Sequence, residues 1–347
     1  MSKSRGVELF CSRRRRNRIV RNHHQSDRGT DWTGCLTFFN RQRRIYPKQS
    51  LSTMGKRGKK AQAGKPKKAS PKDVGKKLNA LVKKLEEELK GADLFAPLPP
   101  TEDCAVCLVP LPRVKGKSAY NACCGNDICV ACNRENKESI NKQNEEKDAG
   151  KKLALTCPFC REPVPTTGLE HMRQLEARAS LNDHVAINQL GVTFEDGVTL
   201  PKDDLRALDS YIRAAELGSD EACNNIAGFL REGIALSKDL EKFLLFIKIG
   251  ALRGLVAARH NAGNYEYYDF GNHELGIRHW KIAAEAGSQL SLDSLKKIYN
   301  ADGQMPGKEF ISKEYMDSLY RVCHDAQEEV KSEEREKHCA DKYSMKC

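Results

Sequence analysis

Eight cysteines lie within 57 consecutive residues of this 347-residue chain, as three C-x2-C pairs and one adjacent pair. They are Cys104, Cys107, Cys123, Cys124, Cys129, Cys132, Cys157 and Cys160. A two-residue gap brings both sulfurs of a pair to the same side of a tight turn, and eight thiols are enough for two tetrahedral zinc sites. The segment has too few apolar residues to form a hydrophobic core, so its fold needs another source of stability, such as a bound metal ion. Structural zinc contributes about 10–16 kcal/mol of apparent binding free energy. The spacing therefore predicts a module folded by two zinc ions; unrelated buried or redox cysteines are the alternative.

The rest of the sequence indicates a reducing compartment. Fourteen cysteines would suggest disulfides in a small secreted protein. However, no apolar stretch of signal-peptide length precedes the first arginines, and no run of about 18 apolar residues could span a membrane. We therefore expect a soluble protein of the cytoplasm, with the nucleus as the alternative, and no membrane partner. In that compartment paired cysteines indicate metal binding.

Charge is concentrated at one end of the chain. Residues 1–77 hold 23 Lys and Arg but only 4 Asp and Glu, whereas the remaining 270 residues carry a net charge of −7. Like charges at this density repel, so residues 1–75 are predicted to be a disordered, solvated basic tail. A nuclear-targeting or RNA-contacting tail is the alternative. Because aromatic residues hardly interleave the lysines, the sequence argues against nucleic acid as a partner.

The first 53 residues show no periodicity and join the following basic segment awkwardly. We therefore expect Met54 to be the initiator methionine and residues 1–53 not to be translated. Gly55 would then follow the initiator, but Lys59 stands where an acylation motif needs Ser or Thr.

An amphipathic helix is predicted over residues 76–92. Its apolar positions are Leu78, Leu81, Val82, Leu85 and Leu89. They form one stripe of a 3.6-residue period, and the opposite face is Lys and Glu. Gly91 and the prolines after it end the helix. We expect this helix to introduce the zinc module.

Within residues 101–165, the spacing of the cysteine pairs resembles the RING finger of ubiquitin ligases. The resemblance implies interleaved ligands. One zinc would bind Cys104, Cys107, Cys129 and Cys132, and the other Cys157 and Cys160 with the Cys123–Cys124 region. Asn126 stands where the family usually has a histidine ligand, which leaves the fourth ligand of the second site open. Cys123 is the obvious substitute, although adjacent residues on one metal strain the backbone.

Three further positions match what the family uses for activity. Val106 precedes the second ligand, Pro158 follows the seventh, and Arg161 follows the eighth. The resemblance implies that Val106 and Pro158 help to dock a ubiquitin-conjugating enzyme and that Arg161 contacts the donor ubiquitin. The alternative is local: the first two shape the zinc-binding turns, and Arg161 is surface charge.

Residues 170–305 show an internal repeat. Ala186, Ala222, Ala258 and Ser291 are separated by 36, 36 and 33 residues, and Gly218, Gly254 and Gly287 recur in step with them. Repeats of this length are helix–turn–helix units that bury a core only by stacking. The pattern resembles Sel-1-like repeats, which are related to tetratricopeptide repeats. The predicted fold is mostly α: a small cross-brace RING-like zinc module followed by an α-solenoid, with residues 306–347 as a C-terminal capping helix and tail.

Outside the zinc module the sequence shows no arrangement expected of a catalytic site. The histidines are scattered and are expected on the surface or in packing. The aromatic residues expected in the core are Tyr265, Tyr267, Tyr268 and Trp280. The cysteines expected to be inert thiols are Cys223, Cys323, Cys339 and Cys347.

Two functions fit these observations. In the first, the protein is a RING-type ubiquitin ligase or adaptor that recruits a conjugating enzyme through the zinc module and a protein substrate through the repeats. It would form no covalent intermediate and would act by orienting bound partners. In the second, zinc only folds a non-enzymatic protein-interaction scaffold.

Overall fold

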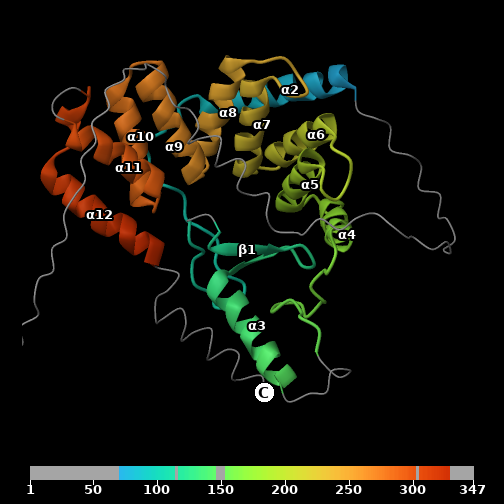
Figure 1. Ribbon diagram of the computed structural model, residues 1–347. Helices are drawn as coiled ribbons and strands as arrows, with labels where there is room; N and C mark the ends of the chain where they lie inside the picture. Colours follow the sequence, from blue (N-terminus) through green and yellow to red (C-terminus); the bar gives the residue numbers. More distant parts are fainter. Residues whose placement is uncertain (1–69, 114–115, 146–152, 302–304, 329–347) are drawn as a thin grey trace, which may run out of the picture. The chain divides into compact units, whose positions relative to one another are not determined.

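The computed structural model of the protein describes residues 70–113, 116–145, 153–301 and 305–328, which all belong to one compact unit. The basic tail before Ser70, with Met54, and the C-terminal residues 329–347, with Cys339 and Cys347, lie outside the described residues. The predicted fold class is confirmed: a small cysteine-rich module is joined to a stack of helices (Figure 1). No helix in the four described ranges is long and apolar enough to cross a membrane.

The helices that follow the cysteine-rich module form the repeat stack. They are α4 (Gly168–Ala179), α5 (His184–Asp196), α6 (Asp204–Glu216), α7 (Asp220–Glu232), α8 (Leu240–Leu252), α9 (Val256–Asn264), α10 (His273–Glu285), α11 (Gln289–Asn300) and α12 (Lys313–Glu328). Each helix packs against the next one along the chain. In Figure 1 they follow one another from yellow-green to red, as expected of units that share their core only with their neighbours.

Left-handed turns separate the repeats at the predicted glycines. Gly218, Gly254 and Gly287 have φ of 102°, 102° and 89°, values that a side chain disfavours. Asn182 adopts φ 59° at the same place in the preceding unit, 36 residues before Gly218. Asparagine tolerates this region better than most residues. The same turn therefore already follows α4, so the repeating backbone pattern begins one helix before α5.

Close packing explains the small residues of the repeats. A Cβ atom on Gly276 of α10 would lie 2.6 Å from the Cβ of Tyr267 and 2.9 Å from the carbonyl oxygen of Gly263. A side chain at this position would therefore push α9 and α10 apart. The chain between them is a short π-helix, Tyr265–Asp269, that carries an aromatic cluster.

The aromatic cluster agrees only in part with the predicted core. Trp280 is fully buried and donates from Nε1 to Asn264 Oδ1, at 3.1 Å, while Tyr267 is 3% exposed. Tyr265 is half-buried and packs at the edge of the core. The prediction for Tyr268 is wrong, because its side chain is 53% exposed. The π-helix turns this residue away from the core that holds its neighbour.

Helix α2 (Pro71–Leu89) begins five residues before the predicted start. The Ser70 side chain caps it by accepting from the amide of Asp73, and proline at the first helical position is favourable there. The buried side chains are Val74, Leu78, Leu81, Val82 and Leu85.

The buried face of α2 belongs to the core of the repeats. The helix packs against α6 and α8, and in Figure 1 it lies across them in blue. Arg253 at the end of α8 holds Glu88 through two contacts, of 2.8 and 3.0 Å. Lys77 pairs with Asp209 of α6 at 2.5 Å. The helix precedes the cysteine-rich module in the sequence, but its apolar stripe finds its partner surface on the repeats.

The linker that leads from α2 to the cysteine-rich module runs along the surface of the repeats. The Arg259 guanidinium donates to the carbonyl oxygen of Leu94. The Phe95 ring lies 3.9 Å from the guanidinium carbon of Arg278 and 4.8 Å from the buried ring of His279. Burial lowers the pKa of His279 to about 3, so this histidine is neutral and serves in packing.

At the other end of the stack, α12 covers α10 and α11. Within residues 306–347, where the sequence predicts a capping helix and tail, the structure has a single 3-10 turn, Lys308–Phe310, before α12 begins at Lys313. Met316, Leu319 and Cys323 of α12 are buried. They complete a second apolar cluster, as a capping helix should.

Candidate metal centre

The first cysteine pair lies on a tight turn. The amide of Cys104 donates to the carbonyl oxygen of Val109 at 2.9 Å, and the amide of Leu108 donates back to the carbonyl oxygen of Cys104 at 2.9 Å. Leu108 follows the second cysteine, Cys107, and has φ of 62°. The chain therefore reverses just after the second sulfur, which leaves both thiols on the inner side of the turn.

The last cysteine pair repeats this geometry. The amide of Cys157 donates to the carbonyl oxygen of Glu162 at 2.7 Å, and the amide of Arg161 donates to the carbonyl oxygen of Cys157 at 3.0 Å. Arg161 has φ of 67°, close to the value for Leu108. The two pairs are thus held by equivalent backbone turns.

A β-hairpin and the helix after it carry the other four cysteines. Strand β1 (Ser118–Asn121) pairs antiparallel with β2 (Asn126–Cys129), and the turn between them holds Cys123, Cys124 and Gly125. Helix α3 (Val130–Glu145) follows directly and carries Cys132 in its first turn. One end of the hairpin therefore presents the adjacent cysteines, and the other presents the second C-x2-C pair, Cys129 and Cys132.

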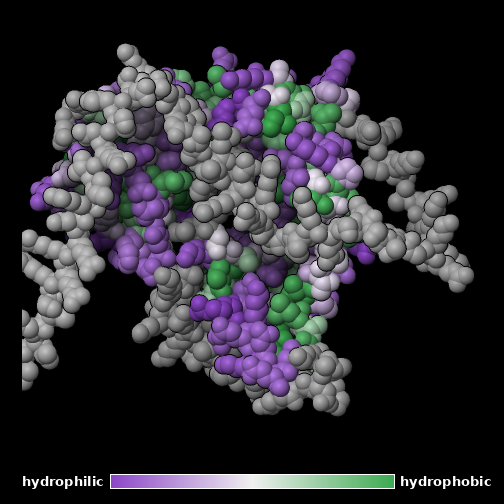
Figure 2. Space-filling view, viewed as in Figure 1, coloured by the Kyte–Doolittle hydropathy of each residue, from purple (hydrophilic) through white to green (hydrophobic). Residues whose placement is uncertain are grey.

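Helix α3 is tied back to the last cysteine turn. Buried Asn136 donates from Nδ2 to the carbonyl oxygen of Thr156 at 2.9 Å. Asn144 makes two hydrogen bonds to the backbone of Leu153, of 2.6 and 3.0 Å. The exposed face of this helix is hydrophilic and stands out below the repeats in Figure 2.

The structure brings the eight cysteines into two groups of four. The first group is Cys104, Cys107, Cys129 and Cys132, and the second is Cys123, Cys124, Cys157 and Cys160. Within each group the sulfurs all lie within 4.8 Å of one another. The two groups interleave in the sequence. Cys123 and Cys124 of the second group lie between the two pairs of the first group, Cys104/Cys107 and Cys129/Cys132.

The second group contains both adjacent cysteines. The sulfur of Cys123 lies 3.4 Å from that of Cys160, and the sulfur of Cys124 lies 3.9 Å from that of Cys157. Asn126 is not in the group; it pairs with Asn121 at the closed end of the hairpin. The fourth position that the sequence left open is thus filled by Cys123.

These distances fit zinc. Four thiolates about 2.3 Å from one tetrahedral ion lie about 3.8 Å apart. In the first group Cys104 and Cys132 are 3.9 Å apart, as are Cys107 and Cys129. The amide of Cys129 also points to the sulfur of Cys104 at 3.3 Å, as a donor that supports a thiolate. The donor set of four sulfurs favours a soft or borderline cation in tetrahedral geometry, and zinc meets both conditions.

In the absence of a bound metal ion, burial determines the protonation state of several of these thiols. It raises the pKa of Cys107, Cys157 and Cys123 above the ordinary thiol value. These groups are therefore protonated at neutral pH in the absence of a cation, and a bound divalent ion has to displace the protons. Metal binding to this module should release protons, and acid should weaken it.

The three positions taken from the family resemblance differ in exposure. Val106 is half-buried against the cysteine cluster, and Arg161 is exposed. Pro158 is buried, so the structure gives it a packing role in the second turn. Two apolar residues that the sequence did not single out, Leu108 and Phe159, are 67% and 51% exposed at the tips of the two cysteine turns. The sequence does carry a sign of both: Leu108 directly follows the second cysteine of the first pair, and Phe159 lies between the two cysteines of the last pair.

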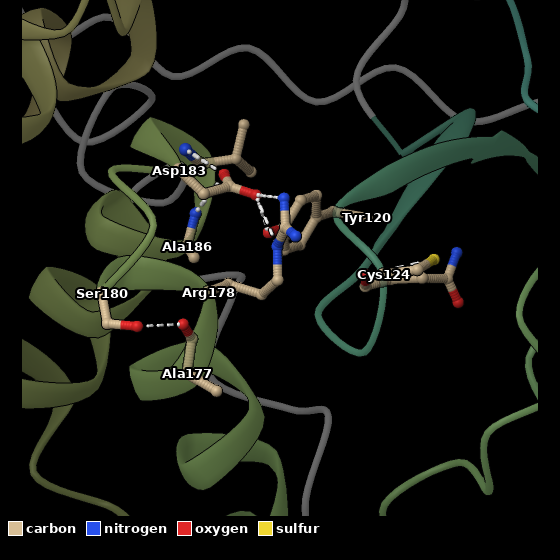
Figure 3. A network of polar contacts seen from close by, with 9 residues as sticks. Tyr120, Cys124, Ala177, Arg178, Ser180, Asp183 and Ala186 are labelled. Atoms are coloured by element: carbon tan, nitrogen blue, oxygen red, sulfur yellow. Dashed lines mark hydrogen bonds and ion pairs between the residues drawn. The ribbon is translucent and has the colours of Figure 1, made fainter.

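A polar network joins the hairpin to the repeats (Figure 3). Tyr120 of β1 donates its hydroxyl to Asp183 Oδ2 at 2.7 Å, and Arg178 of α4 donates to the same oxygen from Nε and Nη2, at 3.0 and 2.8 Å. The other carboxylate oxygen caps α5 through the amides of Val185 and Ala186. Partial burial alone would raise the pKa of Asp183, but hydrogen bonds from Tyr120 and Arg178 lower it below its ordinary value.

This network yields a prediction for stability. Tyr120→Phe removes one hydrogen bond to a charged, largely buried carboxylate, so we expect the zinc-loaded chain to lose about 1.5–3 kcal/mol. The measurement is urea denaturation followed by tyrosine and tryptophan fluorescence. Tyr320→Phe is the control, because the Tyr320 ring is 38% exposed on α12. Equal midpoints for both variants would mean that the network adds nothing to stability.

Comparison with known proteins gives a fold likeness and no family. No known family model matches the chain, and no curated protein does. A Sel1 repeat protein from Oxalobacter formigenes is 25% identical, covers 45% of this chain and 64% of its own, and has a TM-score of 0.39. A protective antigen of uropathogenic Escherichia coli with an SLR fold is 24% identical, with 44% and 33% covered and a TM-score of 0.37. The chain spans less than two thirds of either protein.

Proposed function

We propose that the protein is a RING-type ubiquitin ligase or adaptor. The observation that carries the proposal is the interleaved arrangement of two four-cysteine groups. In this arrangement the two equivalent cysteine turns carry apolar side chains at their tips. Val106 is half-buried, and Leu108 and Phe159 are exposed. Apolar side chains that gather into one exposed patch mark a protein-binding surface, and our proposal requires these three to form such a patch. In the RING family the corresponding surface binds a ubiquitin-conjugating enzyme.

In this proposal the module acts without a nucleophile of its own. The conjugating enzyme carries ubiquitin as a thioester, and binding at the cysteine turns orients it for attack by a substrate lysine. Exposed Arg161 supplies a positive charge beside the second turn, where it would contact the donor ubiquitin.

The repeats would hold the protein substrate, since stacked helical repeats offer extended surfaces for partners. The face of α6 and α8 that α2 covers is not available for this purpose. We place the activity in the cytoplasm or the nucleus, where free thiols persist to bind zinc.

A non-enzymatic scaffold is the second candidate, and one observation favours it. Pro158 is buried, so one of the three positions that the family uses for activity is withdrawn from the surface. In that case the zinc ions only hold the module in shape, and the tips of the cysteine turns bind some other protein.

Discharge of a loaded conjugating enzyme separates the two candidates. We expect Val106→Ala to weaken docking of the conjugating enzyme and Arg161→Asn to slow ubiquitin discharge onto free lysine. A charged hydrogen bond is worth about 1.5–3 kcal/mol, or roughly a ten- to hundredfold rate effect. Asparagine suits the second change because Arg161 has φ of 67°, a region that asparagine tolerates. The assay uses a broad panel of conjugating enzymes.

Zinc content decides how the result is interpreted. Both variants should retain two zinc ions, since neither side chain belongs to a cysteine group. Lys137→Ala, on the exposed face of α3, is the control for loss of a positive charge from the module. If no conjugating enzyme is stimulated by the zinc-loaded wild type, the ligase proposal fails and the scaffold stands.

A further inference from the structure

A groove lies where the linker after α2 meets the last helices of the repeats. One wall is residues 95–98 of the linker, a second is the start of the cysteine-rich module, and the third is the end of α10 with Ala326 of α12. We call this cavity the linker groove. Its volume is about 570 Å³, within the range of about 300–1,000 Å³ that ligand sites have. The cavity is not enclosed, and it opens to solvent.

The lining of the linker groove is mainly apolar. Nine of its twelve lining residues have apolar side chains, among them Phe95 and Pro97 of the linker, Leu111 of the module and Ile282 of α10. A concave apolar surface favours an apolar group as its occupant, because binding removes both surfaces from water.

The linker wall is held in place by the repeats. Arg259 donates to the carbonyl oxygen of Leu94, and the ring of the next residue, Phe95, packs on α10. Arg259 is buried at a position where neighbouring repeats have the apolar residues Cys223 and Leu292. A buried guanidinium is costly unless it donates hydrogen bonds, so its contact with the linker compensates for that burial. A wall fixed in advance loses little conformational entropy when a ligand binds.

One charged group of the groove has no oppositely charged partner. The Arg113 guanidinium donates to the carbonyl oxygen of Pro99, which holds it at the wall. Burial lowers the pKa of Arg113, and within the four described ranges no carboxylate pairs with it. The acidic residue of the lining, Glu285, already accepts from the hydroxyl of Tyr315 at 2.7 Å. A guanidinium has five N–H donors, so Arg113 can still donate to a carboxylate.

We propose that the linker groove binds the carboxyl-terminal end of a partner polypeptide, with an apolar last side chain in the groove and the terminal carboxylate on Arg113. The last residue of a chain carries its side chain and its carboxylate on one Cα atom, so one residue meets both features of the site. A free carboxylic acid of small size fits less well, because sites for small molecules enclose most of the ligand and this groove is open. The proposal concerns binding alone, so it applies to a ligase and to a scaffold alike.

The test measures binding of short peptides to the full, zinc-loaded chain by fluorescence anisotropy. The probe is a fluorescein-labelled hexapeptide, Gly-Gly-Ser-Gly-Leu-Leu, with a free carboxyl terminus. The same peptide with a terminal amide should bind about ten- to hundredfold more weakly, because it lacks the charge that Arg113 recognises. A third peptide that ends in Ser-Ser should bind at least about tenfold more weakly, since it buries no apolar side chain.

Two variants of the protein test the two features of the groove separately. Arg113→Gln should weaken binding of the free-carboxyl peptide about ten- to hundredfold and leave the amide peptide unchanged. Ala326→Phe should weaken both peptides, because its ring occupies the space that a leucine side chain needs. Arg173→Gln is the control for charge, since Arg173 is exposed on α4 at the other end of the repeats, and it should bind like wild type.

Zinc content is measured for every variant and should stay at two, because none of these residues belongs to a cysteine group. If Arg113→Gln loses zinc, Ala326→Phe decides the result. Equal binding of the free-carboxyl and amide peptides to wild type, or binding of neither, would overturn the proposal. The same holds if the variants at Arg113 and Arg173 behave alike. Tighter, Arg113-dependent binding of decanoate than of the peptide would assign the groove to a free carboxylic acid instead.

Discussion

Cys104→Ser will abolish the first zinc site and unfold the cysteine-rich module while leaving the repeats folded. Ile128 is the one large aliphatic side chain of the module that the described residues show as fully buried, and the rest of that cluster is largely cysteine. Without the metal, little apolar burial holds the turns together. Structural zinc contributes about 10–16 kcal/mol of apparent binding free energy, far more than such a core can replace. Elemental analysis should show at most one zinc per chain, against two for wild type.

Two further measurements show which part of the Cys104→Ser variant is unfolded. Limited proteolysis should cut the variant between residues 101 and 165, while helical circular dichroism changes little because the repeats have a separate core. Cys323→Ser is the matched control, since this buried thiol lies in α12 and outside both groups. It should keep both zinc ions. A wild-type chain with a single zinc would remove the second site, and two zincs in Cys104→Ser would refute the assignment of Cys104.

Leu81→Ala will destabilise the repeats, although it lies before the zinc module in the sequence. Leu81 is 1% exposed and belongs to the same apolar cluster as the side chains of α6 and α8. Removing a buried leucine side chain costs about 2–5 kcal/mol, from lost burial and the cavity left behind. Urea denaturation followed by circular dichroism at 222 nm measures the loss. Zinc content should stay at two, because Leu81 is not part of the cysteine cluster.

Asn79→Ala is the control on the same helix. Asn79 lies on the exposed face of α2, so its replacement should change the unfolding free energy by no more than about 0.5 kcal/mol. If Leu81→Ala behaves like this control, α2 is not part of the repeat core.

Much of the cysteine-rich module could be predicted from the sequence. The C-x2-C spacing identifies metal-binding turns because two sulfurs three positions apart reach one ion without help from distant residues. The choice between Asn126 and Cys123 could not be made from spacing alone. The hairpin decides it, since pairing Asn126 with Asn121 leaves Cys123 and Cys124 in the turn beside Cys160.

The repeats were also visible in the sequence, because each unit needs small residues where helices cross and a left-handed residue where one helix ends. The period was found from alanine and glycine, which do not mark the left-handed turn at Asn182. Asparagine adopts the same conformation but is common elsewhere, and it therefore gives a weaker signal than glycine.

By itself, the sequence determined the local features: two sets of paired-cysteine turns suited to a metal ion, an amphipathic helix before them and a helical repeat after them. Each depends on residues within a few positions, or one repeat, of one another. Only the tertiary structure decided where α2 packs, that Pro158 is buried and that Tyr120 joins Asp183. An apolar stripe must be buried and a tyrosine hydroxyl must find a hydrogen-bond partner, but neither identifies that partner in the sequence. The partner surface forms only when segments far apart in the sequence pack together.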